Sequence, residues 1–304
     1  MENIEEIISL AKSLDQRVVS DAFLKDYTTF KIGGKADAFI EISSAEALKQ
    51  LLERLRLLKL KYMVLGRGSN VLFDDKGFNG VILHLGSDFA KIKSIGNKII
   101  AQSGASLMSV CKLALDNSLS GLEFAYGIPG TVGGAVFMNA GAYGGEIKNV
   151  LTSCEVIDKQ GNIKTVLASD MELSYRHSIF QTNGDVILSA TFTLDNTRER
   201  EEISSTMSEL MSRRKAKQPL EFPNAGSTFK RPKGYFAGKL IEDSGLKGYT
   251  VGRAAVSDKH SGFVINLGGA TFEDVTRVIS DVQQKVLHDS GQTLECEVLI
   301  VKHE

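Results

Sequence analysis

The sequence predicts an α+β fold, and three observations lead to this prediction. Helical and strand-like segments follow one another in irregular order. Several neighbouring strands are joined by loops too short for the crossover that a parallel pair requires. The chain has 304 residues, of which 42% are hydrophobic. This length suits about two domains of roughly 150 residues each, and this composition excludes a mainly disordered chain.

Hydrophobic periodicity gives the elements of the first 120 residues. We expect helices over 1–14, 43–59 and 106–117, and strands over 36–42, 61–66 and 80–85. Ser43 followed by Glu46 is interpreted as a capping box that starts the second helix.

Hydrophobic periodicity also gives the elements of the rest of the chain. We expect strands near 153–158, 163–167, 185–194 and 294–301, and helices over 197–217 and 272–288. The helix at 272–288 carries an apolar stripe that a core-facing helix needs. A high charge density begins near residue 197, so we place a domain boundary near residue 200.

Charge and cysteine content exclude several classes of protein. Lys and Arg number 36 against 37 Asp and Glu, for a net charge of -1, which argues against a protein dedicated to nucleic acid. Cys111, Cys154 and Cys296 are far apart and form no C-x-x-C motif. We therefore expect free thiols, with neither a disulfide framework nor a zinc site.

No targeting or membrane signal is recognisable. The acidic N-terminal segment lacks the basic and apolar regions of a signal peptide. No apolar run approaches the ~18 residues that a membrane span needs. We therefore expect a cytoplasmic protein without membrane insertion.

A first glycine-rich loop follows the strand expected at 61–66. It consists of Gly66, Arg67, Gly68, Ser69 and Asn70. Val71 stands where a dinucleotide fingerprint needs its third glycine, and no helix follows, so a Rossmann site is excluded. The loop could form a nest of N–H groups for a pyrophosphate, or it could be a plain tight turn.

A second glycine-rich segment is more specific. Eight of the 29 glycines fall within residues 121–145. The candidate ligand-binding residues of this segment are Gly127, Ile128, Pro129, Gly130, Thr131, Gly133, Gly134, Asn139, Gly141, Ala142 and Tyr143. Backbone this bare can approach a planar ring closely and donate N–H groups to its edge. We interpret the segment as a ligand cradle.

The motifs GRGSN, GIPGTVGGA with NAGAYG, SYRHSIF, NAGSTFKRP and LECEV occur in this order. Together they resemble the UDP-N-acetylenolpyruvoylglucosamine reductases, a family of FAD enzymes. The resemblance implies a two-lobed FAD-binding domain of the vanillyl-alcohol-oxidase/PCMH type over 1–200, with lobes of about 1–80 and 81–200. It further implies a substrate-binding α+β domain over 201–304, whose last strand, 294–301, reaches back to the active site.

The activity implied by this resemblance is the NADPH-dependent reduction of UDP-N-acetylglucosamine-enolpyruvate to UDP-N-acetylmuramate, in peptidoglycan precursor synthesis. FAD would be held non-covalently, because residues 121–147 contain neither His nor Cys. The strand at 185–194 runs directly into the charged helix, so the chain resembles the shorter class, which lacks a Tyr-bearing insertion. We expect a monomer without a metal site, although the sequence itself carries no signal for the oligomeric state.

Three catalytic roles are carried over from the family. Arg176 would bind the substrate carboxylate through its planar, permanently charged fork. Ser227 would donate a proton, and Glu297 would help to polarise the carboxylate. Taken alone, Arg176 would suit a surface ion pair, Ser227 a turn or helix cap, and Glu297 a solvent-facing strand position.

Substrate binding is implied for Lys217, Lys230, Arg231 and His260. Residues 211–304 hold 14 Lys and Arg against 11 Asp and Glu, whereas the rest of the chain holds 22 against 26. Leu299 stands where the family has a further Arg, so that contact must be absent. The basic run 213–215 also fits a solvated surface.

Two other functions remain open from the sequence. One is a flavin oxidoreductase of the same fold that acts on another substrate. The other is a non-catalytic sensor of flavin or nucleotide sugar. The NAGSTFKRP and LECEV motifs speak against the first, and the joint presence of Arg176, Ser227 and Glu297 speaks against the second.

Overall fold

The computed structural model describes residues 2–303 and divides into two compact units. Unit 1 comprises the residues up to Ser20, Ala38–Arg67 and Gly80–Arg214, and unit 2 comprises Asp21–Asp37, Gly68–Asn79 and the residues from Lys215 on. The expected single cut near residue 200 therefore differs from these units. Two early segments belong with the C-terminal part because β4 (Val71–Phe73) pairs in parallel with β16 (Leu299–Val301).

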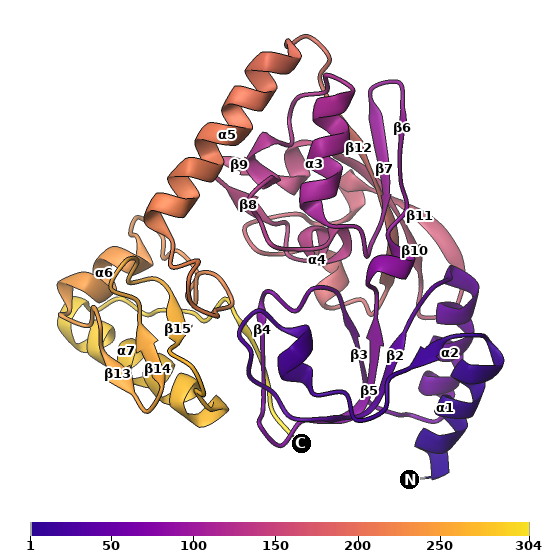
Figure 1. Cartoon of the computed structure of the whole chain (residues 1–304), viewed down its shortest axis with the longest axis horizontal. Helices are drawn as coiled ribbons and strands as arrows, with labels where there is room; N and C mark the ends of the chain where they lie inside the picture. The colour runs from indigo at the N-terminus through magenta and orange to yellow at the C-terminus, as the bar shows by residue number, and fades with distance from the viewer. Residues whose placement is uncertain (1, 304) are drawn as a thin grey trace. The chain divides into compact units, whose positions relative to one another are not determined.

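The first sheet of unit 1 has the strand order β1-β2-β5-β3. Its strands are Arg17–Val18 (β1), Ala36–Glu41 (β2), Tyr62–Leu65 (β3) and Phe78–His84 (β5). Helices α1 (Glu2–Ser13) and α2 (Ala45–Leu57) lie next to each other beside β2 and β5 (Figure 1). Their buried faces share a core with the strands, in which Ile7, Leu51 and Val81 are fully buried.

The capping box expected at Ser43 is wrong by one residue. The N-cap of α2 is Ser44, whose side chain accepts a hydrogen bond from the backbone N–H of Ala47. Ser43 instead donates both its N–H and its hydroxyl to Oε1 of Gln16, at 2.7 and 3.1 Å. A long-range partner for Ser43 thus decides which serine caps the helix.

The second sheet of unit 1 is antiparallel, with the order β11-β10-β12-β7-β6. Its strands are Ile92–Ile95 (β6), Lys98–Gln102 (β7), Leu151–Ile157 (β10), Ile163–Leu167 (β11) and Val186–Thr193 (β12). Helix α3 (Leu107–Asp116) packs with this sheet, and so does α4 (Val132–Phe137), a short helix that the sequence analysis did not expect. Helix α5 (Arg200–Lys217) adds Ile203 and Met207 to this core.

Short elements connect these larger ones. They are β8 (Gly141–Ala142), β9 (Gly145–Glu146) and the 3-10 helices η1 (Leu24–Tyr27), η2 (Ser87–Phe89), η3 (Glu123–Ala125), η4 (Ile147–Asn149), η5 (Ala168–Asp170) and η6 (Ile179–Gln181).

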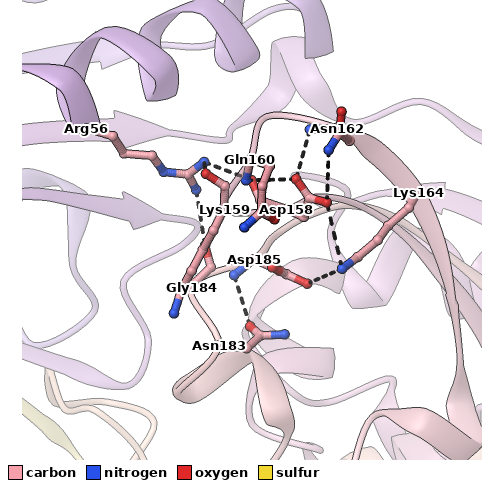
Figure 2. A network of polar contacts seen from close by, with 9 residues as sticks. All are labelled: Arg56, Asp158, Lys159, Gln160, Asn162, Lys164, Asn183, Gly184 and Asp185. Atoms are coloured by element: carbon pink, nitrogen blue, oxygen red, sulfur yellow. Dashed lines mark hydrogen bonds and ion pairs between the residues drawn. The ribbon is translucent and has the colours of Figure 1, made fainter.

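Arg56, in the last turn of α2, joins the helix to the second sheet (Figure 2). Its Nη1 donates to the carbonyls of Asp158 (2.8 Å) and Lys159 (3.2 Å), and its Nη2 donates to the carbonyl of Gly184 (3.1 Å). Asp158 in turn accepts the N–H groups of Gln160 and Asn162, both at 2.9 Å. One planar fork therefore holds the β10–β11 turn and the segment before β12.

We expect Arg56→Met to lower the free energy of unfolding by about 1–3 kcal/mol, because three carbonyls lose a charged donor. Arg56→Lys should recover only part of this loss, since an ammonium cannot reproduce the fork. Urea unfolding measures both values. The control is Arg17→Met, which removes one exposed ion pair with Glu41 and should cost less than about 1 kcal/mol. Equal losses at positions 56 and 17 would contradict this account.

Unit 2 contains the antiparallel sheet β13-β14-β15. Its elements are α6 (Ala237–Asp243), β13 (Thr250–Val251), β14 (Ala254–Val256), β15 (Val264–Asn266) and α7 (Phe272–Ser290). Thr271 and Asp274 form a capping box on α7, and its stripe of valines is buried as expected. The strand expected over 294–301 is shorter than predicted, because its first part pairs only through a bridge between Cys296 and Phe229.

Within residues 2–303, no helix combines the length and the apolar character that crossing a bilayer requires. All three cysteines are free thiols, and Cys111 and Cys154 are buried. Burial raises the pKa of both thiols to about 12, so they act as small apolar side chains.

Candidate active site

The two glycine-rich motifs, far apart in the sequence, meet at the start of α4. A Cβ on Gly66 would lie 2.3 Å from Oγ1 of Thr131, the N-cap of that helix. A Cβ on Gly133 would lie 2.7 Å from the Cβ of Ser103. Both glycines therefore permit close packing of backbone that any larger residue would prevent.

The first N–H groups of α4 already have partners within the protein. Val132 donates to the carbonyl of Ala105 and Gly133 to that of Ser103, each at 2.8 Å. The N–H of Gly134 donates to Oγ1 of Thr131 at 3.4 Å. The glycine-rich sequence predicted N–H groups that face the edge of a ring, whereas these N–H groups bond within a close-packed frame of the protein.

The loop 68–70 offers unused donors. Gly68 has a φ of +60°, a left-handed conformation that favours glycine. Among residues 2–303, the N–H groups of Gly68 and Ser69 donate to no protein acceptor. Asn70 differs, since its side chain donates to the carbonyl of Glu297 (3.1 Å) and its carbonyl accepts from Leu299 (3.0 Å). The loop thus fits a phosphate at two N–H groups, while Asn70 positions the Glu297 segment.

Arg214 belongs to the basic run 213–215, for which the sequence also suggested a solvated surface. Its Cδ lies 2.9 Å from the place of a Cβ on Gly127, and burial lowers the pKa of its guanidinium from the usual value. Neighbouring Arg213 pairs with Glu209 at the surface. Within the described chain, Arg214 has no carboxylate partner. A half-buried cation beside Gly127 suits an anionic cofactor or substrate.

Arg176 lies at the tip of a tight turn between Ser174 and His177, whose backbones exchange two hydrogen bonds. Its φ of +56° is left-handed, which costs a non-glycine residue about 1–2 kcal/mol. Its Nη2 donates to the carbonyl of Gly141 at 3.2 Å, and its guanidinium lies 5.0 Å from the ring centroid of Tyr175. Strain of this kind is often retained at functional positions.

The NAGAYG segment forms the hairpin β8–β9 beside Arg176. Asn139 is fully buried, whereas Tyr143, with a φ of +53°, is 44% exposed. Glu146 accepts a hydrogen bond from Asn139 at 3.2 Å. The pKa of Glu146 lies below its usual value, first because of Lys148 and then because of Asn139 and the charge of Arg176.

In unit 2, Ser227 and Glu297 lie on two paired segments. Glu297 donates its N–H to the carbonyl of Thr228 (2.8 Å), and Lys230 donates its N–H to the carbonyl of Glu295 (2.8 Å). Gly226, before Ser227, has a φ of +78° and donates its N–H to the side chain of Asn224 (2.9 Å). The structure therefore brings the two predicted residues to neighbouring backbone positions, and both are half-buried.

The predicted substrate-binding residues divide into two groups. Lys217 and His260 lie within electrostatic range of each other. Lys230 is instead paired with the Glu295 carboxylate. Arg231 is exposed, and its guanidinium lies 4.5 Å from the ring centroid of Phe236. Lys217 and His260 are thus the better-placed pair for an anionic group.

His260 gives a prediction on pH. Burial, and secondarily the charge of Lys217, lower its pKa from 6.5. The unfolded chain therefore takes up a proton near pH 6.5, whereas the folded chain takes it up only at a lower pH. The contribution of His260 to the free energy of unfolding is fully present above pH 6.5 and falls as the pH drops toward the lowered pKa. We expect His260→Gln to flatten urea-unfolding stability between pH 7.5 and about 5.5. The control is His303→Gln at the exposed C-terminal end, and an unchanged slope in His260→Gln would contradict the assignment.

Comparisons with known proteins show the family of the chain. Residues 36–167 match the family model "FAD binding domain", and residues 218–301 match "UDP-N-acetylenolpyruvoylglucosamine reductase, C-terminal domain". The chain is 48% identical over 287 residues to the UDP-N-acetylenolpyruvoylglucosamine reductase of Clostridium perfringens, covering 94% of each chain.

Two solved structures are similar to the chain. The UDP-N-acetylenolpyruvylglucosamine reductase of Thermus caldophilus has a TM-score of 0.80 and 34% identity, over 94% of this chain and 99% of that one. A glucooligosaccharide oxidase of Acremonium strictum has a TM-score of 0.50 and 13% identity, over 95% and 60%. The second likeness concerns the fold alone, and it agrees with the predicted α+β architecture of the oxidase type.

Proposed function

The chain belongs to the UDP-N-acetylenolpyruvoylglucosamine reductase family, and on this premise we propose that it reduces UDP-N-acetylglucosamine-enolpyruvate to UDP-N-acetylmuramate for peptidoglycan synthesis. The observations that carry the proposal in detail are that Nη2 of Arg176 donates to the carbonyl of Gly141, and that the N–H of Glu297 donates to Thr228, the residue after Ser227. Their assignment to one reaction is part of the proposal.

FAD is the proposed cofactor, held without a covalent bond. The donors of Gly68 and Ser69 suit its diphosphate, and Arg214 beside Gly127 supplies positive charge. The chemistry that bound, reduced FAD would supply is a hydride for the terminal carbon of the enolpyruvyl double bond. With the exceptions of Arg214 and Arg176, we assign FAD binding to residues 1–200 and substrate binding to 201–304, in keeping with the two matched family models.

Three side chains would carry out the rest of the reaction. Negative charge develops on the carbon next to the carboxylate as the double bond is reduced. The fork of Arg176 binds the carboxylate and stabilises that charge as it spreads. Glu297 polarises the same group. The hydroxyl of Ser227 donates the proton that completes the saturated carbon, and this serine is reprotonated from solvent.

Binding of the UDP portion is assigned to Lys217 and His260, with Lys230 and Arg231 as outer contacts. His260 has a lowered pKa and is neutral at pH 7, so it offers hydrogen bonds, while Lys217 offers charge. The donor of reducing equivalents in this proposal is NADPH. We further propose that the protein is a monomer that acts in the cytoplasm on small molecules. It is not proposed to bind nucleic acid.

A direct test uses the purified protein. It should be yellow, and it should oxidise NADPH when either UDP-N-acetylglucosamine-enolpyruvate or oxygen accepts the electrons. A folded protein that is colourless and does not bind added FAD would refute the cofactor assignment. A yellow protein whose NADPH oxidation is not stimulated by the substrate under nitrogen would refute the reaction.

Arg214 provides a prediction on cofactor affinity. Arg214→Met should keep the packing against Gly127 while removing a half-buried charge, so we expect the FAD-free protein to melt at a higher temperature. FAD should bind at least about tenfold more weakly, because a charged hydrogen bond is lost. Flavin fluorescence titration measures the second effect, with Arg213→Met as the control. Unchanged FAD affinity in Arg214→Met would contradict this role.

A further inference from the structure

The left-handed turn that carries Arg176 is anchored to the end of α4 by two amide side chains. Asn139 donates from Nδ2 to the carbonyl of Ser174 at 2.8 Å. Gln181 donates from Nε2 to the carbonyl of Arg176 itself at 3.1 Å and to that of Phe137 at 2.9 Å. Ser174 and Arg176 are therefore both held through their backbone carbonyls.

Asn139, and the segment that carries Gln181, are themselves fixed. Asn139 is fully buried, and its Oδ1 accepts the N–H of Lys148 at 2.9 Å. Ser178, also fully buried, donates its hydroxyl to the carbonyl of Phe137 at 2.7 Å. The 174–181 segment is thus tied to residues 137–139 at several points, and this leaves the strained turn little freedom to relax.

The same frame sets the surroundings of the Arg176 side chain. Its Nη2 donates to the carbonyl of Gly141, two residues after Asn139. Glu146, which accepts from Asn139, lies within electrostatic range of the guanidinium. A change at Asn139 or Gln181 would therefore alter the direction of the fork without touching it.

We infer that Asn139 and Gln181 are positioning residues that hold Arg176 in its left-handed conformation and so present its fork to the substrate carboxylate. The link to substrate rests on the proposed function, whereas the holding of the turn does not. Asn139 had been expected to contact the cofactor. Its three hydrogen bonds to the protein favour this positioning role.

The holding of the turn is tested by thermal unfolding, without any substrate. Gln181 is exposed, so Gln181→Met should fold. It should lower the melting temperature in the wild-type chain, and it should lower it much less in an Arg176→Gly chain, because glycine adopts a positive φ without strain. Gln50→Met, which removes a hydrogen bond to Glu46 in α2, should be equally costly in both backgrounds. Equal losses for Gln181→Met in both backgrounds would overturn the inference.

The catalytic consequence is tested by stopped flow. In Gln181→Met, reoxidation of the reduced flavin by the enolpyruvyl substrate should slow about tenfold, since a misplaced group loses its orientation. FAD content and flavin reduction by NADPH should stay as in the wild type, which a general structural defect would not allow. With Arg176→Met already present, Gln181→Met should add little.

Asn139→Asp keeps the acceptor for Lys148 but loses the donors to Ser174 and Glu146, so it should slow reoxidation at least as much as Gln181→Met does. A wild-type reoxidation rate in Gln181→Met, or a further tenfold loss on top of Arg176→Met, would overturn the positioning role. If the substrate fails to reoxidise the wild-type flavin, the proposed function falls, and the melting comparison still decides whether the two amides hold the turn.

Discussion

Ser227→Ala should reduce the rate at which the enolpyruvyl substrate reoxidises the flavin by about a thousandfold, the usual contribution of a positioned proton donor. Reduction of the flavin by NADPH should be unaffected, because the proposed proton transfer belongs to the second half-reaction alone. Ser227 follows Gly226 and precedes Thr228, whose backbone is paired with Glu297, so loss of one hydroxyl leaves the segment in place.

The measurement is stopped-flow flavin absorbance, with each half-reaction followed separately. Ser261→Ala is a matched control, since it removes another hydroxyl from unit 2, one that is buried. Ser227→Cys should recover part of the rate, because a thiol can also donate a proton. Equal losses in both half-reactions of Ser227→Ala would show that the serine has another role.

Arg176→Met should lower the same reoxidation rate by roughly a hundred- to a thousandfold, as removal of a group that stabilises developing charge does. Arg176→Lys should recover little, since an ammonium lacks the planar fork that binds a carboxylate at two points. The half-saturating substrate concentration should rise in both variants. Arg198→Met, which removes an ion pair with Glu123, is the control in unit 1, and reoxidation of Arg176→Met at the control rate would exclude the clamp.

Much of the fold could be predicted from local patterns. The strands expected near 153–194 and the helix expected at 272–288 have strong periodicity, and both occur, the helix as Phe272–Ser290. The division of the chain could not be predicted, because it depends on a parallel pairing between residues 71–73 and 299–301. Such pairing joins distant segments and leaves no local pattern.

The candidate site shows the same division between local and long-range information. Arg176, Ser227 and Glu297 were expected from their motifs, whereas the positive φ of Arg176 and the amides that hold its turn follow from tertiary contacts. Asn70 and Asn139 lie within glycine motifs, which suggested cofactor contacts. Their side chains instead bond the backbone of Glu297 and Ser174. A spacing of residues cannot reveal which acceptor an amide finds.

Arg214 is a residue for which the sequence suggested exposure and the structure shows partial burial. A run of three basic residues at the end of a charged helix suggests a solvated surface, and Arg213 fits that description. Arg214, one residue further along the helix, lies instead against Gly127. Helical spacing could have separated the two, because Arg214 stands seven residues after Met207 and three after Met211, on the face of α5 that carries the buried Met207.

The central claim is that this chain reduces an enolpyruvyl double bond, with Ser227 supplying the proton. The most direct measurement mixes the photoreduced protein anaerobically with one equivalent of UDP-N-acetylglucosamine-enolpyruvate and follows flavin absorbance and product mass together. The account predicts full reoxidation and a product heavier by two hydrogens, and a rate that collapses in Ser227→Ala. A flavin that stays reduced in the wild-type protein, with the substrate recovered unchanged, would contradict it.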